Sequence, residues 1–589
     1  MEIAHKTYSL PDFIRLPFRA APVSTVLCLL QVVLNALVPS LQAVLTARFI
    51  DTALLIFAGQ ASASRIGFPL LLIILLLLYQ YTAQSLIGLA KTRLTLRLTE
   101  TYRLAILTKR ARLSYEHVEN NETWDLITRV GQDPAERLMK GFQCLLQLIA
   151  LIFYVGSLLA VVGAQVWWTA PLILAFSVPL FALSIRSGKR TYEASKEAAK
   201  YTRRAKYLQS VLTSREAAAE RHLFGFAPAL GRRYEQAFSA AYHINYKTQR
   251  KVFIKMKGSG LITVLICILT AAVLIAPLGA GQISIGIFMS FITATFNLAQ
   301  SISWQLTDIA SQLADHREYL RDLTAFAALS ETPGALDPAG PPPPAPARIE
   351  FRNVSFTYPG TETPILNGLS FTLSAEKHYA FVGANGAGKT TIIKLLTGLY
   401  PQYSGEIWID DRELRTLPPS ELKAMFSVVY QDFAKYEVPF AESITLKQRP
   451  LRPAVLHDLS LDAVEAALPQ GEATPLGRVR AGGVDLSGGE WQRVAIARSL
   501  MSQAPVYILD EPTAALDPVA ESEVYELFGR ISQGHAALLI THRLGAAKLA
   551  DEILVIDGGR LAEQGSHEAL LRRGGLYASM FEAQKGWYT

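Results

Sequence analysis

The stretch Gly383-Ala384-Asn385-Gly386-Ala387-Gly388-Lys389-Thr390-Thr391 follows a short apolar run at residues 378–382 and precedes a predicted helix at residues 390–398. It matches the pattern G-x-x-x-x-G-K-[ST] of phosphate-binding loops. Its glycines let backbone N–H groups curl around phosphate oxygens, and the helix directs the positive end of its dipole at them. Lys389 can reach the β- and γ-phosphates, and the Thr390 hydroxyl can bind Mg²⁺. The stretch therefore predicts a domain that binds a nucleoside triphosphate.

The segments around this loop predict a largely parallel sheet flanked by helices. Short apolar strands alternate with helical stretches, and the strands are predicted at residues 378–382, 426–430, 506–509, 536–540 and 553–556. The strand at 506–509 ends in Asp510 and Glu511. A carboxylate at Asp510 can hold Mg²⁺ or its waters opposite the phosphate loop. Glu511 is the candidate to polarise an attacking water molecule.

A second candidate anion site lies at Leu486-Ser487-Gly488-Gly489-Glu490, ahead of a helical stretch at residues 491–501. Ser487 and Glu490 fit a capping box, which places Ser487 at the N-terminus of a helix. The two glycines leave N–H groups accessible to an anion. On the local sequence alone, a well-capped helix without any ligand is the competing interpretation.

The first 330 residues have a different character. They carry 34 Lys and Arg against 19 Asp and Glu, a net charge of +15, whereas residues 331–589 carry 23 against 31, a net charge of −8. A helix that crosses about 30 Å of hydrocarbon needs about 20 apolar residues. Six runs without any Lys, Arg, Asp or Glu predict transmembrane helices at residues 23–45, 68–89, 144–162, 167–185, 261–276 and 283–298. This division argues against nucleic acid as a partner and predicts a lipid bilayer instead.

The charges of the loops predict the orientation. Residues 91–140 hold ten Lys and Arg and residues 186–257 hold seventeen, whereas the loops on the opposite side hold only Arg65. The positive-inside rule therefore places the long loops and both termini in the cytoplasm. A tight turn is predicted at residues 163–165, a loop at residues 277–282 that includes Pro277-Leu278-Gly279, and helical extensions into the cytoplasm at residues 201–224 and after residue 306.

The ends of the N-terminal half are also recognisable. Residues 1–22 contain acidic residues and three prolines, which argues against a signal peptide. Leu10, Phe13, Ile14 and Phe18 predict a short interfacial helix, and a flexible tail is the alternative. A run of prolines between residues 333 and 346 predicts a semi-rigid extended linker. The expected domains are residues 1–330, a linker at 331–348, and residues 349–589.

Taken together, these residues resemble the ATP-binding cassette (ABC) transporter family, and the resemblance extends over essentially the whole chain. Residues 486–490 are similar to the family's signature motif. Tyr358 matches the aromatic residue that stacks on adenine, and Gln431 matches the glutamine that contacts Mg²⁺ and the attacking water. Asp517, in Ala515-Leu516-Asp517, matches the D-loop, and His542 matches the switch histidine that contacts the γ-phosphate.

The resemblance implies an α-helical membrane domain with six transmembrane helices, of the exporter type, joined to an α/β P-loop NTPase domain. The implied cofactors are ATP and Mg²⁺. The residues implied in catalysis are Glu511, His542, Gln431 and Lys389. Those implied in nucleotide binding are Tyr358, Gly383, Ala384, Asn385, Gly386, Ala387, Gly388, Lys389, Thr390, Thr391, Ser487, Gly488, Gly489 and Asp517. Those implied in metal binding are Thr390, Gln431 and Asp510.

In this family, ATP is bound between the phosphate loop of one cassette and the signature motif of another. The resemblance therefore implies that one chain is half of a functional transporter. The partner is a second half-transporter chain, in a homodimer or a heterodimer. Segments near residues 116–125 and 210–221 are implied to carry cassette closure to the membrane helices. One departure is Thr474-Pro475-Leu476-Gly477, where many exporters have a glutamate.

The cargo is defined only by class. The spans contain neutral polar residues, namely Gln31, Asn35, Gln42, Tyr79, Gln80, Tyr81, Gln84, Gln147 and Asn297. If several share a cavity, it suits an amphipathic small molecule, lipid or peptide; the alternative is that they hold helices together. ATP-driven export is therefore expected from a multi-pass membrane protein with its cassette in the cytoplasm. The alternatives are an exporter-shaped importer, for example of metal chelates, and a membrane-anchored regulatory ATPase without cargo.

Overall fold

The computed structural model describes residues 2–585 except 166, 168, 216, 376, 447–449, 513–520, 523, 527–528 and 530–535, and it gives only the backbone of some helical residues between 165 and 304. The chain forms two compact units. The helical unit comprises Met1–Arg110 and Asp125–Ala328, and the α/β unit comprises Ala111–Trp124 and Leu329–Thr589.

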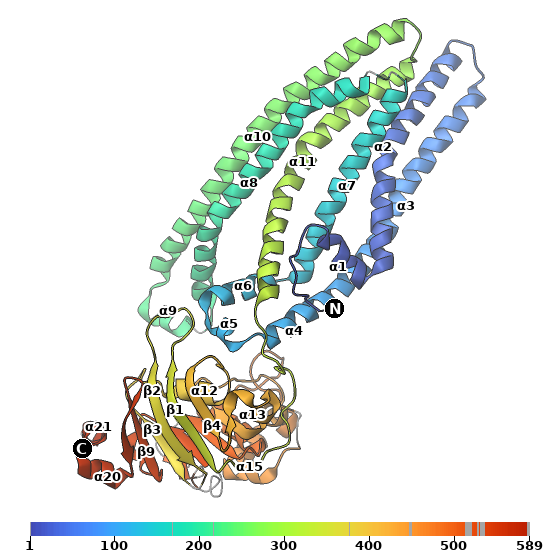
Figure 1. Cartoon of the computed structure of the whole chain (residues 1–589). Coiled ribbons are helices and arrows are strands. Elements are labelled where there is room, and N and C mark those ends of the chain that lie inside the picture. The colour runs from blue at the N-terminus through green and yellow to red at the C-terminus, as the bar shows by residue number, and fades with distance from the viewer. Residues whose placement is uncertain are drawn as a thin grey trace. The chain divides into compact units, whose positions relative to one another are not determined.

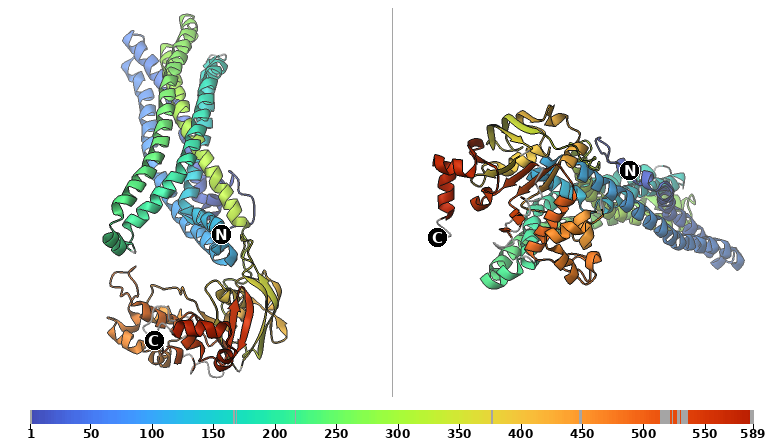
Figure 2. Two further views of the ribbon diagram at one scale, coloured as in Figure 1. Left: turned by 90° about the vertical axis from the view of Figure 1, so that its left-hand side faces the viewer. Right: turned by 90° about the horizontal axis from the view of Figure 1, so that it is seen from below.

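Long helices make up the helical unit (Figure 1). Within the described residues, one long helix takes up all or nearly all of each predicted span, and α8 and α11 each begin two residues after the predicted start. These helices are α2 (Pro22–Phe57), α3 (Gly67–Leu98), α7 (Pro134–Gln165), α8 (Thr169–Thr213), α10 (Ala227–Gly279) and α11 (Ile285–Ala328). Helix α8 packs along α10, and α2 packs along α3, as Figure 1 and the left panel of Figure 2 show. Every one of these helices is longer than the apolar run that predicted it, because several polar turns continue each helix beyond that run.

Apolar composition marks several of these helices as membrane-spanning. Among the described residues, Pro22–Phe57, Ala63–Arg112 and Pro134–Ala164 are long and apolar enough to cross a membrane, and Cys267–Gly279 and Ile285–Leu298 are shorter apolar stretches. Large apolar side chains on α3 point outward, including Leu71, Leu75 and Leu78, each about half exposed. A surface of this kind is stable against lipid and unfavourable in water.

Three sequence-based boundaries in this unit are wrong. Residues 163–165 continue α7, and Pro277-Leu278-Gly279 ends α10, so the turn follows at Gly281, where φ is 70°. The predicted helix at residues 201–224 is interrupted, since α8 ends at Thr213 and α9 runs over Ala218–Phe224. A single proline in the last turn of a helix removes only one backbone hydrogen bond. Pro277 therefore does not end α10 early.

The N-terminal segment forms a helix and does not form a flexible tail. Helix α1 (Asp12–Ala20) buries Phe13 completely, and the Phe13 ring packs on Gly141 and meets the ring of His316 edge-on at 5.5 Å. The Tyr8 N–H donates a 2.9 Å hydrogen bond to the Thr324 hydroxyl. These contacts fasten the segment to α7 and α11.

A six-stranded sheet is the centre of the α/β unit, with strand order β10-β9-β3-β8-β7-β6. Its strands are β3 (His378–Val382), β6 (Phe426–Val429), β7 (Val506–Asp510), β8 (Ala536–Ile540), β9 (Glu552–Asp557) and β10 (Arg560–Gly565). All neighbours pair in parallel except β9 and β10. The five predicted strands are therefore confirmed to within one residue, and β7 and β8 are wholly buried, as expected of parallel strands covered on both faces.

A second sheet was not predicted. It is antiparallel in the order β2-β1-β4-β5 and consists of β1 (Arg348–Phe356), β2 (Leu366–Ser374), β4 (Ser404–Ile409) and β5 (Arg412–Glu413). Residues of both sheets share one apolar core around Phe351, Phe371 and Phe381.

The remaining helices complete the two units. They are α4 (Leu104–Arg112), α5 (Tyr115–Glu119), α6 (Asn121–Gly131), α12 (Lys389–Leu396), α13 (Pro419–Met425), α14 (Phe440–Thr445), α15 (Pro453–Asp458), α16 (Leu461–Ala467), α17 (Gly488–Met501), α19 (Leu544–Ala547), α20 (His567–Arg573) and α21 (Leu576–Lys585). The Pro-rich segment begins with a turn that is held by Lys423 of α13. The Lys423 ammonium donates to the carbonyl groups of Gly334, Ala335 and Asp337 at 2.8–2.9 Å.

Candidate functional site

The candidate site lies at the carboxyl edge of the parallel strands. A different functional group follows each of four neighbouring strands there. The phosphate loop follows β3, Gln431 follows β6, Glu511 follows β7 and His542 follows β8. Since β3, β8, β7 and β6 are adjacent and parallel, their carboxyl ends lie at one edge. The topology therefore gathers residues that are up to about 160 positions apart in the sequence.

The phosphate loop has the backbone that its glycines allow. Gly386 and Gly388 have φ values of 82° and 103°, and Gly388 caps α12. A side chain at Gly383 would place its Cβ 2.2 Å from the Ile556 carbonyl oxygen, so this position has no room for one. The ammonium of Lys389 is buried and donates to the carbonyl groups of Gly383 and Ala384 at 2.8 and 3.0 Å. Burial lowers the pKa of Lys389, although Glu511 and Asp510 oppose that shift.

Asp510 has the properties of a metal ligand. Its side chain is 1% exposed, and its Oδ1 atom has no hydrogen-bond partner among the described groups. Burial raises its pKa to about 6, and a hydrogen bond with Thr390 opposes the shift. An unpartnered carboxylate oxygen beside a hydroxyl group is the oxygen set that Mg²⁺ prefers. The residues present therefore fit Mg²⁺.

Glu511 and His542 form a pair across neighbouring strands. The Glu511 Oε2 atom lies 3.2 Å from Nδ1 of His542, and the Glu511 side chain is 13% exposed. Glu511 adopts a left-handed backbone with φ of 49°, while its N–H donates to the Ile540 carbonyl at 3.0 Å. A left-handed conformation at a glutamate costs on the order of 1 kcal/mol and is typical of functional positions. A carboxylate and an imidazole therefore lie side by side at the carboxyl edge of the sheet.

Tyr358 lies against α12, the helix that begins at the phosphate loop. Its hydroxyl is 2.9 Å from the Thr391 hydroxyl. Its ring meets Tyr400 edge-on at 5.5 Å, and the Lys394 ammonium lies 5.4 Å from its centroid. The predicted adenine-stacking residue is therefore brought to the phosphate-binding helix.

Helix α5 reaches the same helix α12. The Glu119 carboxylate accepts hydrogen bonds from the Lys394 ammonium and from the Tyr400 hydroxyl. Tyr115 packs edge-on against Tyr400 at 5.6 Å. The hydrogen bond to Glu119 raises the pKa of Lys394 despite the opposing effect of burial. The segment expected to contact the cassette near residues 116–125 does so through Glu119, and sequence reasoning missed Lys394 and Tyr400 because no motif marks them.

The signature segment has the predicted capping box. The Ser487 hydroxyl accepts from the Glu490 N–H at 3.3 Å, and the Glu490 carboxylate accepts from the Ser487 N–H at 2.7 Å. Ser487 and Gly488 are exposed at the start of α17. Among the described contacts none joins this segment to the phosphate loop of the same chain. Asp517 lies outside the described residues.

Residues 474–479, where the family's glutamate is missing, obtain a carboxylate from elsewhere in the chain. Glu437 accepts hydrogen bonds from the N–H groups of Arg478 and Val479, both at 3.0 Å. Leu476 is buried, and its N–H donates to the Val438 carbonyl at 3.0 Å. Glu437 therefore fixes this segment to the loop that follows β6.

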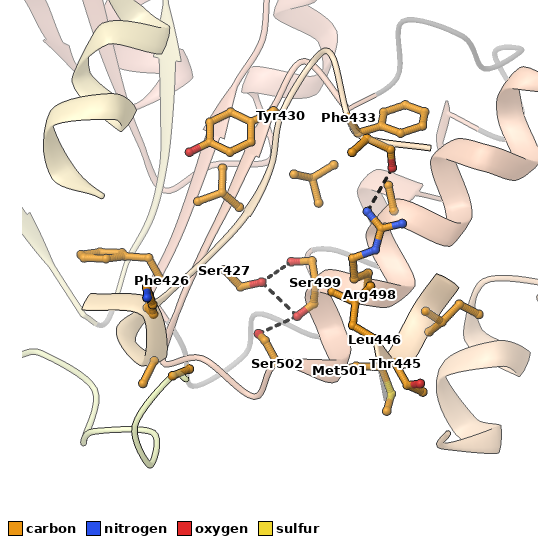
Figure 3. Close-up of a pocket in the computed structure, with 18 of the residues that line it drawn as sticks. Phe426, Ser427, Tyr430, Phe433, Thr445, Leu446, Arg498, Ser499, Met501 and Ser502 are labelled. Carbon is orange, nitrogen blue, oxygen red and sulfur yellow. Dashed lines mark hydrogen bonds between the residues drawn. The ribbon is translucent and has the colours of Figure 1, made fainter. Parts of the chain in front are cut away.

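A cavity of about 470 Å³ lies beside the loop that contains Gln431 (Figure 3). Figure 3 shows Arg498 on one wall, where it donates to the Ala434 carbonyl at 3.2 Å, and Ser427 bonded to Ser499 at the base. Burial lowers the pKa of Arg498. This cavity is separate from the phosphate loop, since none of its lining residues belongs to that loop.

Comparisons with known proteins agree with the fold of both units. Residues 366–514 match the family described as ABC transporter, and residues 25–301 match the ABC transporter transmembrane region. The subtilin transport ATP-binding protein SpaT of Bacillus subtilis is 30% identical over 81% of this chain and 79% of its own length. An ATP-dependent lipid A-core flippase of Xylella fastidiosa is 30% identical over 82% of both chains. A bacterial Atm1-family ABC exporter solved with ATP bound has the same fold, with a TM-score of 0.75, 23% identity, and coverage of 95% of this chain and 99% of that chain.

Proposed function

Because this chain belongs to the ABC transporter family, and is a multi-pass membrane protein that couples ATP hydrolysis to transport with its cassette in the cytoplasm, we propose that it exports an amphipathic small molecule, lipid or peptide as a dimer of half-transporters. The observation that carries this proposal is the Glu511–His542 pair at the sheet edge that also bears Lys389. Relatives named for subtilin transport and for lipid A-core flipping support an amphipathic cargo.

The residues of the site have distinct proposed roles. Lys389 exchanges its bonds to the loop carbonyls for bonds to the β- and γ-phosphates of ATP. Tyr358 stacks on adenine, Glu511 orients and deprotonates the attacking water, and His542 holds the proton at the carboxylate or contacts the γ-phosphate. Thr390, Asp510 and Gln431 hold Mg²⁺, which neutralises phosphate charge when it is bound.

The site of one chain is half of the proposed catalytic unit. The exposed start of α17, with Ser487, Gly488 and Gly489, is available to the nucleotide of a second chain. ATP held across two cassettes would stabilise their closed dimer, and hydrolysis would release it. The proposed domains are residues 1–330, a linker at 331–348, and a cassette at 349–589.

Uptake into inverted membrane vesicles tests this function, with hydrophobic dyes, peptides and fluorescent lipids as probes. Export predicts ATP-dependent accumulation in inverted vesicles. Accumulation only in right-side-out vesicles loaded with ATP would identify an importer instead. ATP hydrolysis without movement of any probe, in either orientation, would favour a regulatory ATPase.

A further inference from the structure

The helical unit contains a cavity of about 880 Å³ lined by α2, α3, α7 and α11. Carboxamide side chains dominate its polar lining, and they are Gln31, Asn35, Gln42, Gln84, Asn297 and Gln305. Five of these belong to the neutral polar residues expected in the spans; Gln305 was not expected. Tyr79, Gln80, Tyr81 and Gln147 do not line the cavity. The neutral polar residues of the membrane helices therefore fall into two groups. The six carboxamides that line the cavity are called the cavity set, and the other residues lie outside it.

Helical spacing explains how the cavity set comes together. Gln31, Asn35 and Gln42 are separated by four and seven residues, which puts all three on one face of α2. Asn297 and Gln305 are eight residues apart on one face of α11. Along α2 this row extends about 16 Å at about 1.5 Å per residue. The cavity is thus lined with amides along its length and not at one point.

These carboxamides do not hold the helices together. Among the described residues, none of the six forms a side-chain hydrogen bond with another protein group, and Oδ1 of Asn35 is buried without a partner. The contrast is Ser40 of α2, which bonds to Ser157 of α7 at 2.7 Å. Unpaired amide groups in a membrane interior are costly unless water or a ligand satisfies them. The row is therefore free to bind cargo.

One cation completes the lining. Lys91 of α3 borders the cavity seven residues, two helical turns, after Gln84. No Asp or Glu is among the lining residues that the structure describes. Lys91 follows the predicted span at residues 68–89, so it lies toward the cytoplasmic end. An anionic end group on the cargo would find its counter-charge there.

We propose that this cavity binds a peptide, with the carboxamides bonded to its backbone amides and Lys91 paired with its terminal carboxylate. A peptide presents a donor and an acceptor at every residue, about 3.4 Å apart when extended, and so matches a row of amides. The acyl chains of a lipid would leave the same amides unsatisfied. Val32, Ile87 and Leu151 supply apolar wall between the amides for the peptide side chains. This inference rests on the proposed function and specifies its cargo.

Direct binding tests the inference without requiring turnover. The probe is an apolar hexapeptide labelled at its N-terminus, and its anisotropy is measured with the full-length protein in lipid nanodiscs without nucleotide. We expect Gln84→Leu to weaken binding about fivefold, since one hydrogen bond is lost, and Asn35→Leu with Gln84→Leu about 25-fold. Gln80→Leu is the matched control, because Gln80 lies on the same helix outside the cavity, and it should bind as the wild type does.

A second comparison varies the peptide on the wild-type protein, so its first result does not depend on how a variant folds. The peptide with a free carboxylate should bind about tenfold more tightly than its C-terminal amide. As a follow-up, Lys91→Gln should abolish that difference. Equal affinity for backbone N-methylated and unmodified peptides, or binding of a fluorescent lysophospholipid together with no binding of the peptide, would overturn the inference. Dye uptake without peptide binding would refute the inference alone, whereas peptide binding without ATP-driven uptake of any probe would refute export alone.

Discussion

Glu119 of α5 and Lys394 of α12 are 275 residues apart and form an ion pair inside the α/β unit. Lys394 also lies 5.4 Å from the ring of Tyr358. One lysine therefore contacts both the candidate adenine-binding aromatic residue and the segment that connects two helices of the helical unit. This arrangement provides a physical route by which nucleotide at α12 can act on residues 111–124.

Removal of the Glu119 carboxylate should weaken that route. Glu119→Ala leaves the half-buried Lys394 without its partner, so we expect the transport rate per ATP hydrolysed to fall about tenfold while ATP still binds. The measurement is the ratio of probe uptake to phosphate release in proteoliposomes. Glu122→Ala is the control, because Glu122 is exposed nearby and its carboxylate has no partner among the described residues. A wild-type ratio in Glu119→Ala would exclude Glu119 from coupling.

Tyr358 allows stacking and hydrogen bonding to be separated. Tyr358→Phe keeps the ring and loses the bond to Thr391, whereas Tyr358→Ala loses both. Stacking of a base on an aromatic ring contributes about 1–3 kcal/mol. We therefore expect KM for ATP to rise about tenfold or more in Tyr358→Ala and less than threefold in Tyr358→Phe. If the two variants have equal KM values, Tyr358 does not stack on adenine.

His316 should make stability depend on pH. Burial lowers its pKa; Asp315 opposes the shift, and Arg137 and Lys140 add to it. The folded protein therefore binds its proton more weakly than the unfolded chain does, so stability is complete above about pH 6.5 and declines as the pH falls below it. Tm measured from pH 8 to pH 5 should decline less in His316→Phe than in the wild type. His243→Phe, an exposed control, should retain the wild-type decline; identical curves for all three proteins would refute the assignment.

Gly286 permits a close approach between α2 and the start of α11. Its N–H donates to Asp51 at 2.8 Å, and a Cβ there would lie 2.1 Å from the Ala47 carbonyl oxygen. Overpacking of this kind costs about 1–3 kcal/mol. Gly286→Ala should lower Tm by several degrees, whereas Gly279→Ala, whose Cβ would meet nothing within 4 Å, should not. An unchanged Tm in Gly286→Ala would show that α2 and α11 can move apart without a measurable loss of stability.

Local patterns predicted the parts of this fold that depend on neighbouring residues. The phosphate loop, the capping box at Ser487 and five buried strands each involve consecutive residues, and the structure reproduces them. The antiparallel sheet was missed because the alternation of buried and exposed residues in β1 is interrupted at Arg352 and Asn353, where its register shifts, and because its strands pair at distances the sequence does not mark. Two helix ends were placed too early because α7 and α10 continue through Gln165 and Gly279, and the predicted helix at residues 201–224 is interrupted after Thr213.

The contacts between distant residues could not be predicted. The bonds of Glu119 to Lys394 and Tyr400 join segments that carry no shared motif. Spacing put Gln31, Asn35 and Gln42 on one face of α2, but only the packing of α2 with α3, α7 and α11 turns that face into a cavity wall. Among the site residues, Glu511 was predicted from its place after a buried strand, whereas Gln431 and His542 were predicted from the family resemblance; all three follow strands of the parallel sheet.

The most direct test compares ATP-dependent probe uptake into inverted vesicles by the wild type and by Glu511→Gln. We expect the wild type to accumulate the probe against a gradient. We expect Glu511→Gln to bind ATP with wild-type affinity, to hydrolyse it at least 100-fold more slowly and to accumulate no probe. Glu526→Gln, which alters an exposed glutamate, should behave as the wild type does. Wild-type hydrolysis and uptake in Glu511→Gln would contradict the claim that hydrolysis at this site drives transport.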